Sequence, residues 1–451
     1  MLLPLLAFVI GVFAIVFFVI RLKLPAFIGL TLSAFIVGIV TPEIPFAEVP
    51  AQIATIFGNT MTGIGIPILM ASVVGKSLMD SGAAIRIVRG FLNVTGEEKS
   101  ELSLLGSSYL LSIPVFFDNV FYLLAPLARA MKARTKIKYP LYIACISAGA
   151  LVTHTLVPPT PGPLAMASNI GVDVGMVMIV GIIVAIPCSV VGGLVYGRWI
   201  DKRLDIPLRE TMGSTKESLE QVANKPLEEL PGLGVSLLPI ILPVIFVGSD
   251  TITKAIGVSE SVGGLTSFIG NPTFALTIAA LIAASILAMQ KGFSTEELAE
   301  SLERSLESGG IIVAITAAGG AFGGILKAAG VGQAIAGGLS ELGIPLIVSA
   351  WLITGLIKIA QGSTTVALLT TSSIMAPFAS QLSCHPVYLI TAIGTGGMMF
   401  SWFNDSGFWI INKVAGLNES ETFKVWSFLN PVMSITGIIM TLIMSRLFPL
   451  I

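Results

Sequence analysis

The sequence is poor in charged residues. Only 11% of its 451 residues are Asp, Glu, Lys or Arg, and 54% are hydrophobic, whereas about a quarter of the residues in a soluble domain are charged. So few charges cannot make a water-soluble surface on a chain of this length. The formal net charge of -1 also leaves no basic face, so nucleic acid is not expected as a partner.

The chain also has few residues suited to metal binding or nucleophilic catalysis. Its three cysteines, Cys145, Cys188 and Cys384, lack the spacing of a disulfide framework or a metal site. Each is interpreted as a small packing residue. The two histidines, His154 and His385, cannot form a metal site alone. No nucleophile–base pair is visible, so an intramembrane enzyme has little support, and neither a cofactor nor a metal ion is expected.

Apolar segments recur from end to end of the chain instead. A helix that crosses a bilayer needs about 20 predominantly apolar residues, and most of the runs approach this length. They predict an all-α polytopic membrane protein embedded in the lipid bilayer. Residues 1–20 have no cationic leader and are followed by Arg21 and Lys23, which favours a retained first span over a cleaved signal peptide. The apolar runs are 2–20, 27–40, 56–78, 174–195, 235–247, 274–289, 311–326 and 432–444.

The cationic residues gather in a few places, which mark cytoplasmic loops by the positive-inside rule. The only sustained hydrophilic stretch, 197–231, is predicted to be a cytoplasmic linker. It separates a first transmembrane half, 1–196, from a second half, 232–451. The clusters of Lys and Arg lie at 21–23, 86–89, 129–138 and 198–225.

The two halves resemble each other in sequence. Three short matches occur in the same order at nearly constant offsets of 248, 246 and 247 residues, which indicates an internal duplication. Counting crossings from the cytoplasmic charges predicts that the repeats are inverted, the arrangement of many secondary transporters. The matches are GKSLMDSG (75–82) with GGILKAAG (323–330), YPLY (139–142) with HPVY (385–388), and ISAG (146–149) with IGTG (393–396).

Four apolar segments are too short to cross or are interrupted. Segments 101–132 and 345–380 each hold two short apolar pieces around a turn, and they are predicted to be re-entrant hairpins. Spans 141–170 and 387–416 are predicted to be broken helices. The first holds four prolines within 158–163, which cannot stay helical, and the second breaks around the sequence NDSG. Irregular backbone survives at bilayer depth only inside protein or beside a wet cavity. The breaks therefore predict one protected polar site, with helix N-termini directed at an anion.

Ionisable residues at these breaks are candidates for proton coupling. A carboxylate at bilayer depth costs a few kcal/mol and usually has a function, which applies to Asp118 and Asp405. Capping of the following helix is the alternative role for each of them. His154 lies beside the proline-rich break, and its ordinary pKa near neutrality suits proton exchange. A satisfied structural histidine is an equally good interpretation, and His385 is interpreted as incidental.

Hydroxyl groups cluster at the tip of the second predicted hairpin. Ser363, Thr364 and Thr365 can bind a substrate or can bond back to helix carbonyls, and their position at the tip favours binding. Lys358 lies one turn before the tip. Its ammonium can face the anion or extend outward to water along its aliphatic stem, and outward extension is the preferred interpretation.

Taken together, these residues resemble the gluconate permease (GntP-type) family of proton symporters, within the larger ion transporter superfamily. The PPxPGP, QGSxTVA and NDSGFW patterns are fairly specific in combination, and flanking similarity covers nearly the whole chain. The motifs are FFDNVFYLLAPLA (116–128), HTLVPPTPGPLA (154–165), QGSTTVALLTTSS (361–373) and NDSGFWIINK (404–413).

The resemblance implies uptake of gluconate or a related sugar-acid or hydroxy-acid anion with protons across the bacterial inner membrane. It also implies paired hairpins, homodimers and elevator-like movement of a transport domain. Many members have Glu at the position of Asp118 and His at that of Thr160. A sodium-coupled carboxylate transporter or a D-serine-type transporter on the same scaffold therefore stays open as an alternative. The predicted substrate-binding residues are Asp118, Asn119, Thr155, Thr160, Gly362, Ser363, Thr364, Thr365, Asn404, Asp405 and Ser406, and the predicted proton-coupling residues are Asp118, Asp405 and His154.

Overall fold

The computed structural model describes residues 2–22, 24–135, 138–209, 226–257, 259–330, 345–402 and 405–450. Within these ranges every regular element is helical and no strand occurs, as the composition predicts. Seven helical runs in the described part are long and apolar enough to cross a membrane. They are Phe46–Asp80, Tyr139–Ile170, Val174–Asp201, Leu233–Lys254, Pro272–Lys291, Thr295–Leu326 and Glu419–Leu447.

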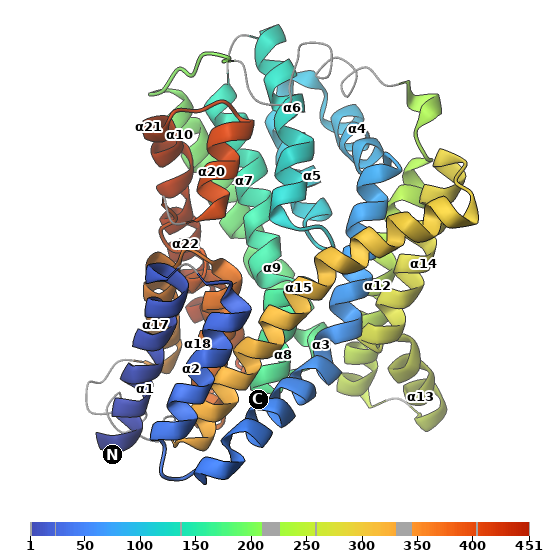
Figure 1. The fold of residues 1–451 in the computed structure, drawn as a ribbon. Helices are drawn as coiled ribbons and strands as arrows, with labels where there is room; N and C mark the ends of the chain where they lie inside the picture. Colours follow the sequence, from blue (N-terminus) through green and yellow to red (C-terminus); the bar gives the residue numbers. More distant parts are fainter. Residues whose placement is uncertain are drawn as a thin grey trace.

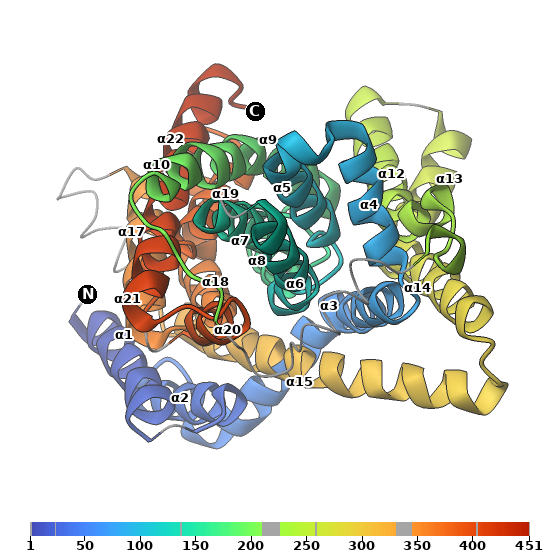
Figure 2. The ribbon, with the colours of Figure 1, turned by 90° about the horizontal axis from the view of Figure 1, so that it is seen from above.

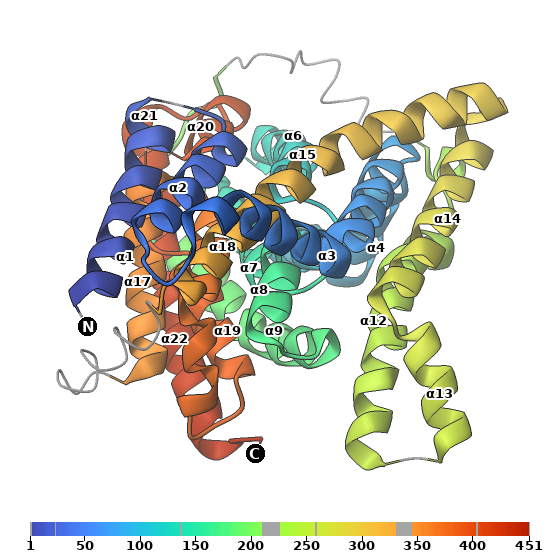
Figure 3. The ribbon, with the colours of Figure 1, turned by 60° about the horizontal axis from the view of Figure 1, so that its bottom comes forward.

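One group of helices forms the outer part of the molecule. The long helices α3 and α15 run obliquely across it side by side (Figures 1 and 3). They approach closely because Gly320 and Gly324 of α15 face Thr60 and Ile56 of α3, where a side chain on either glycine would collide. Helices α12, α13 and α14 stand on the opposite side from α1 and α2 (Figure 2). The group comprises α1 (Leu2–Ile15), α2 (Ala26–Val40), α3 (Val49–Asp80), α4 (Ala83–Thr95), α12 (Leu233–Ile256), α13 (Glu260–Ile269), α14 (Pro272–Lys291) and α15 (Thr295–Ala328).

The remaining helices form an inner group around α7, which lies near the centre in the view from above (Figure 2). Almost every residue of α7 is buried, so this helix faces protein on all sides. The inner group comprises α5 (Ser100–Leu111), α6 (Phe117–Thr135), α7 (Tyr139–Leu156), α8 (Pro161–Ile170), α9 (Val174–Ser189), α10 (Gly197–Asp201), α17 (Leu346–Gln361), α18 (Thr364–Met375), α19 (Val387–Gly396), α20 (Ser406–Val414), α21 (Glu419–Thr422) and α22 (Leu429–Leu447). The three cysteines are free and buried, which agrees with a packing role.

The inner helices break where the sequence has residues that cannot continue a helix. Residues 157–160 separate α7 from α8, because Pro158 and Pro159 lack the N–H that a helix interior requires. Gly362 ends α17 with a positive φ of 76°, a conformation that glycine adopts without steric cost. Its N–H closes the helix on the Lys358 carbonyl at 2.8 Å.

The two halves repeat their packing as well as their sequence. A Cβ on Gly149 of α7 would collide with Ser108 Oγ and the Leu105 carbonyl of α5. A Cβ on Gly396 of α19 would collide in the same way with Thr354 and with the Trp351 carbonyl of α17. Corresponding positions lie 246 or 247 residues apart. The contact of α5 with α7 is therefore built in the same way as the contact of α17 with α19.

One pair of helices at corresponding positions of the two halves, α9 and α22, packs side by side. Helix α9 continues through a π-helical segment, Val190–Tyr196, into α10, and lies against α22. Along this contact Cys188 faces Gly437, Gly192 faces Met433, and the Tyr196 hydroxyl donates to the Lys424 carbonyl. From one contact to the next, residue numbers rise along the first helix and fall along the second, so α9 and α22 are antiparallel.

One helix of each half packs against a helix of the other half. Helix α8 of the first half packs on α18 of the second, where Gly162 meets Leu368. Helix α20 of the second half packs on α6 of the first, where Gly407 faces Phe117. These reciprocal contacts join the two halves within the inner group.

Candidate functional site

The turn between α17 and α18 presents the predicted hydroxyl cluster. Ser363 is the N-cap of α18, and its Oγ accepts a hydrogen bond from the Val366 N–H at 3.4 Å. Thr364 Oγ1 donates to the Gly397 carbonyl at 3.3 Å, which ties the turn to the end of α19. Ser363, Thr364 and Thr365 are all half-buried, whereas Gly362 is buried beneath them. The turn therefore offers hydroxyl groups at the edge of the buried interior.

A buried ion pair lies directly behind this turn. Lys358 is only 1% exposed, and its Nζ lies 2.7 Å from Asp405 Oδ2 and 2.9 Å from the Gly362 carbonyl. The prediction that Lys358 extends outward to water is wrong. A buried ammonium is costly unless it is paired and hydrogen-bonded, and the carboxylate and carbonyl together meet that requirement here.

Asp405 is held from three directions. Its Oδ1 accepts from the Gly407 N–H at 2.9 Å, which caps α20, so the predicted capping role is present. Its Oδ2 accepts from the Lys358 ammonium and from the Ser401 hydroxyl. Trp426 Nε1 in turn donates to Ser401 Oγ at 2.9 Å. The carboxylate thus joins α17, α20 and the segment that precedes α22.

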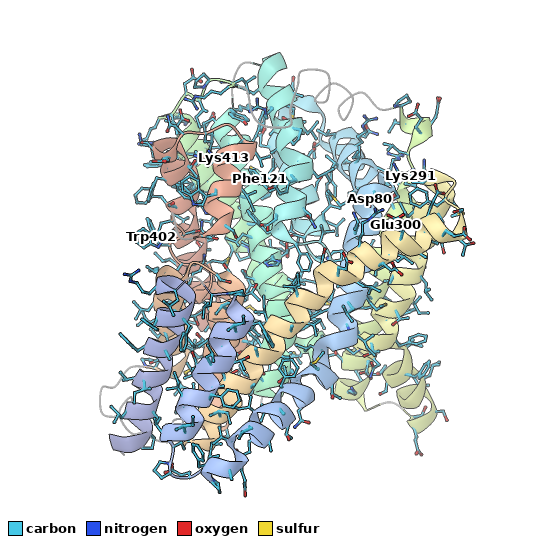
Figure 4. The ribbon with its side chains drawn as sticks, viewed as in Figure 1. Asp80, Phe121, Lys291, Glu300, Trp402 and Lys413 are labelled. Carbon is cyan, nitrogen blue, oxygen red and sulfur yellow. The ribbon has the colours of Figure 1, made fainter. Side chains whose placement is uncertain are left out.

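The segment between α19 and α20 is fastened to α17 a second time. Trp402 Nε1 donates to the Ile359 carbonyl at 2.9 Å, although the indole is 40% exposed. Figure 4 shows Trp402 at the margin of the helical body. Ser406, the first residue of α20, is exposed beside the buried Asp405. Asn404, another predicted ligand, lies outside the described residues.

Asp118 approaches the same place from α6. It lies in the first turn of that helix, half-buried, and it interacts electrostatically with Asp405. Its neighbour Phe117 packs against Trp426, with ring centroids 5.2 Å apart. Within the described residues no hydrogen bond or ion pair to the Asp118 carboxylate is found. Asn119 is exposed.

At the break between α7 and α8, the threonine hydroxyl groups bond to nearby backbone carbonyls. Thr155 Oγ1 donates to the Leu151 carbonyl at 3.0 Å, and Thr160 Oγ1 donates to the carbonyls of His154 and Val157 at 2.9 and 2.8 Å. Both threonines are buried. His154 packs edge-on against Phe116, and its Nδ1 is buried without a hydrogen-bond partner among the described residues. His154 alone in this break therefore offers an unused polar atom.

Three features of the site were not predicted. They are the Lys358–Asp405 pair, the Ser401 and Trp426 chain behind it, and the bonds from Asn169 Nδ2 to Ser372 and Ser373 at 2.9 and 3.0 Å. The sequence did contain one signal for the Lys358–Asp405 pair. Lys358 interrupts a long apolar run, and a cation within such a run is a functional candidate by default.

The arrangement suits a small anion with hydroxyl groups. The start of α18 and the start of α20 meet at one ammonium, because Lys358 bonds to Gly362 before the first helix and to the cap of the second. Helix N-termini carry partial positive charge and free N–H groups. The described residues hold no group of three or more His, Cys, Asp or Glu that could bind a metal ion.

Comparisons with known proteins identify permeases as relatives of this chain. The family model described as GntP family permease matches residues 3–447. An uncharacterized permease of Haemophilus influenzae is 34% identical, over 94% of this chain and 88% of its own length. The gluconate permease of Pseudomonas aeruginosa is 31% identical over 94% of each chain. The high-affinity gluconate transporter of Escherichia coli is 31% identical, over 98% of this chain and 99% of its own length.

Two solved structures have a similar fold. The YdaH transporter of Alcanivorax borkumensis aligns with a TM-score of 0.63 at 12% identity, over 94% of this chain and 99% of its own. MtrF of Neisseria gonorrhoeae aligns with a TM-score of 0.61 at 16% identity, over 88% and 84%. At these identities the similarity concerns the fold alone.

Proposed function

Because the chain belongs to the GntP family of permeases, we propose that it imports gluconate or a related hydroxy-acid anion together with protons. Family membership makes it a multi-pass membrane transporter and not an enzyme. The observation that carries the proposal is the meeting of two helix N-termini at the buried Lys358 ammonium, next to three accessible hydroxyl groups. Relatives named for gluconate support the choice of anion.

The substrate is proposed to lie against the turn between α17 and α18. Ser363, Thr364 and Thr365 would bond to its hydroxyl groups, and the exposed Ser406 and Asn119 would contact it from α20 and α6. These side chains are uncharged and face the edge of the interior, so they can exchange water for the hydroxyl groups of a sugar acid at little cost.

A carboxylate of the site is proposed to carry the proton. The carboxylates of Asp118 and Asp405 repel each other electrostatically when both are ionised, and mutual repulsion of two carboxylates favours the binding of one proton. His154 is a third candidate, since its buried Nδ1 has no described partner.

Sodium coupling is the alternative, with Asp405 as an oxygen ligand. The Lys358 ammonium already occupies the position beside Asp405 Oδ2 and the Gly362 carbonyl that a cation would take. This observation favours protons over sodium. A D-serine-type substrate is the alternative to a hydroxy acid at the same site.

Alternating access is proposed to follow from two inverted repeats, each with a re-entrant hairpin and a broken helix. The antiparallel course of α9 and α22 and the reciprocal α8–α18 and α20–α6 contacts support this topology. Inverted repeats provide two interchangeable conformations around one midplane site. The inner group would move against the outer group as an elevator, in a homodimer within the inner membrane.

Uptake of radiolabelled gluconate into proteoliposomes tests the proposal. An imposed inward proton gradient without sodium is expected to drive accumulation, and a protonophore is expected to abolish it. Liposomes without protein are the control. Accumulation that requires sodium and survives the protonophore would overturn proton coupling. If gluconate is not taken up, other hydroxy acids and D-serine are tested in the same assay.

A further inference from the structure

We infer that Lys358 is the counter-ion of the substrate carboxylate, and that protonation of Asp405 releases it for this task. The inference rests on the proposed anion–proton symport and specifies its coupling step. When Asp405 is ionised, its Oδ2 holds the ammonium. When Asp405 takes a proton from solution, the ammonium bonds instead to the carboxylate of the substrate. Proton and anion then leave together, and the ion pair forms again.

The geometry leaves room for this exchange. An ammonium has three N–H donors, and the described residues accept from Lys358 at two places, Asp405 Oδ2 and the Gly362 carbonyl. Gly362 lies immediately before the half-buried Ser363 and Thr364. The buried ammonium is therefore bonded to the residue immediately before hydroxyl groups that a substrate can reach.

Charge counting explains why the proton is needed. Lys358 of α17 faces Asp405, and Asp118 of α6 interacts with it electrostatically, so the cluster carries a net charge of -1 when both carboxylates are ionised. One proton makes it neutral and a second makes it positive. An anion therefore binds more tightly after protonation, and the two ligands favour each other.

Other charged groups on the packed elements lie elsewhere. Lys413 of α20, labelled in Figure 4, is exposed about two turns beyond Asp405, and Lys424 of the segment before α22 is exposed. Glu421 of α21 is paired with Arg209, which also bonds to Gly416 beyond the far end of α20. Arg129 of α6 is buried and donates to the Ala415 carbonyl, also beyond the far end of α20. These groups can tune the cluster only weakly, because they are screened by solvent, already paired, or lie more than two helical turns from Asp405.

The first half of the molecule provides an internal control. Ser112 stands 246 residues before Lys358, and its hydroxyl donates to the Val115 carbonyl at 3.1 Å. Thr160, the N-cap residue of α8, stands 245 residues before Asp405, the N-cap of α20. The same helical arrangement forms there without any ion pair. Since the pair is not needed to build the fold, and buried pairs seldom stabilise more than apolar replacements, a transport role is the better explanation.

Counterflow and accumulation separate this role from a structural one. Asp405→Asn imitates the protonated carboxyl, so the variant is expected to keep gluconate counterflow in the absence of gradients. Its counterflow should depend less on pH than that of the wild type, and it should lose proton-driven accumulation. Lys358→Gln is expected to raise the half-saturating gluconate concentration of counterflow by about tenfold or more, as for loss of a charge-assisted hydrogen bond.

A double variant covers the possibility that Lys358→Gln does not fold. Lys358→Gln with Asp405→Asn leaves no lone buried charge, and it should still bind gluconate about tenfold more weakly than Asp405→Asn alone. Lys254→Gln is the matched control, because Lys254 forms a 2.6 Å pair with Asp250 in α12, outside the site. Equal half-saturation in the double variant and in Asp405→Asn would overturn the inference. A wild-type protein that transports no hydroxy acid would instead overturn the proposed function.

Discussion

The two halves of this transporter build the same turn with different chemistry. In the first half the positions are Ser112 and Thr160, whose hydroxyl groups bond to nearby carbonyls. In the second half they are Lys358 and Asp405, which form a buried ion pair. The helices around both turns pack alike through Gly149 and Gly396. The shared architecture therefore does not depend on the ion pair, which lies in the second half.

The largest expected effect comes from leaving one charge of the pair alone. Lys358→Leu strands the Asp405 carboxylate in the interior, which is expected to cost about 3–5 kcal/mol of stability. Ser112→Ala, at the corresponding position, removes one neutral hydrogen bond and should cost about 1 kcal/mol. Thermal unfolding of the purified variants in detergent measures both. Equal unfolding midpoints would show that the second turn tolerates a lone charge and would remove the contrast between the halves.

The next largest loss of stability should be equal in the two halves. Gly149→Ala and Gly396→Ala each place a Cβ against a backbone carbonyl and a side chain of the neighbouring helix. Overpacking of this kind costs about 1–3 kcal/mol. Gly248→Ala is the control, since no atom lies within 4 Å of its added Cβ, and in α12 it should be neutral or slightly stabilising. A large difference between Gly149→Ala and Gly396→Ala would contradict the structural equivalence of the halves.

Most of the fold could be predicted from the sequence, because the helix breaks have local causes. Pro158 and Pro159 cannot continue α7, and Gly362 supplies the left-handed residue that ends α17. Constant offsets between matching segments also indicate the duplication without reference to structure. The inverted orientation remains a prediction, supported by the antiparallel packing of α9 and α22.

The ion pair could not be predicted, because it depends on long-range packing. Lys358 and Asp405 are 47 residues apart and belong to different helices. One turn from a helix end, a lysine stem can reach either outward or inward, and the sequence alone does not distinguish the two directions. The internal bonds of Thr155 and Thr160 were equally invisible. The sequence therefore located the helix breaks, whereas the partners of the polar groups at these breaks required the structure.

Asp118 offers a way to sharpen the comparison, since it is a carboxylate of the first half that interacts electrostatically with Asp405. If Asp405 is the coupling group, Asp118→Asn removes a repulsive charge and should lower the half-saturating gluconate concentration by about threefold to tenfold at neutral pH. Proton-driven accumulation should persist. If Asp118→Asn abolishes accumulation but leaves counterflow normal, Asp118 of the first half would instead be the residue that carries the proton.

The smallest expected effects concern single hydroxyl groups at the two breaks. Ser363→Ala removes a half-buried hydroxyl at the proposed binding turn and should raise the half-saturating concentration by about threefold to tenfold, as for loss of one neutral hydrogen bond. Thr160→Val removes a buried hydroxyl that is already bonded to His154 and Val157, so it should change stability by about 1 kcal/mol and leave half-saturation nearly unchanged. Counterflow on both variants measures the contrast. A larger effect on half-saturation from Thr160→Val than from Ser363→Ala would place the substrate against the first half, and the neutral turn rather than the charged one would then be the binding surface.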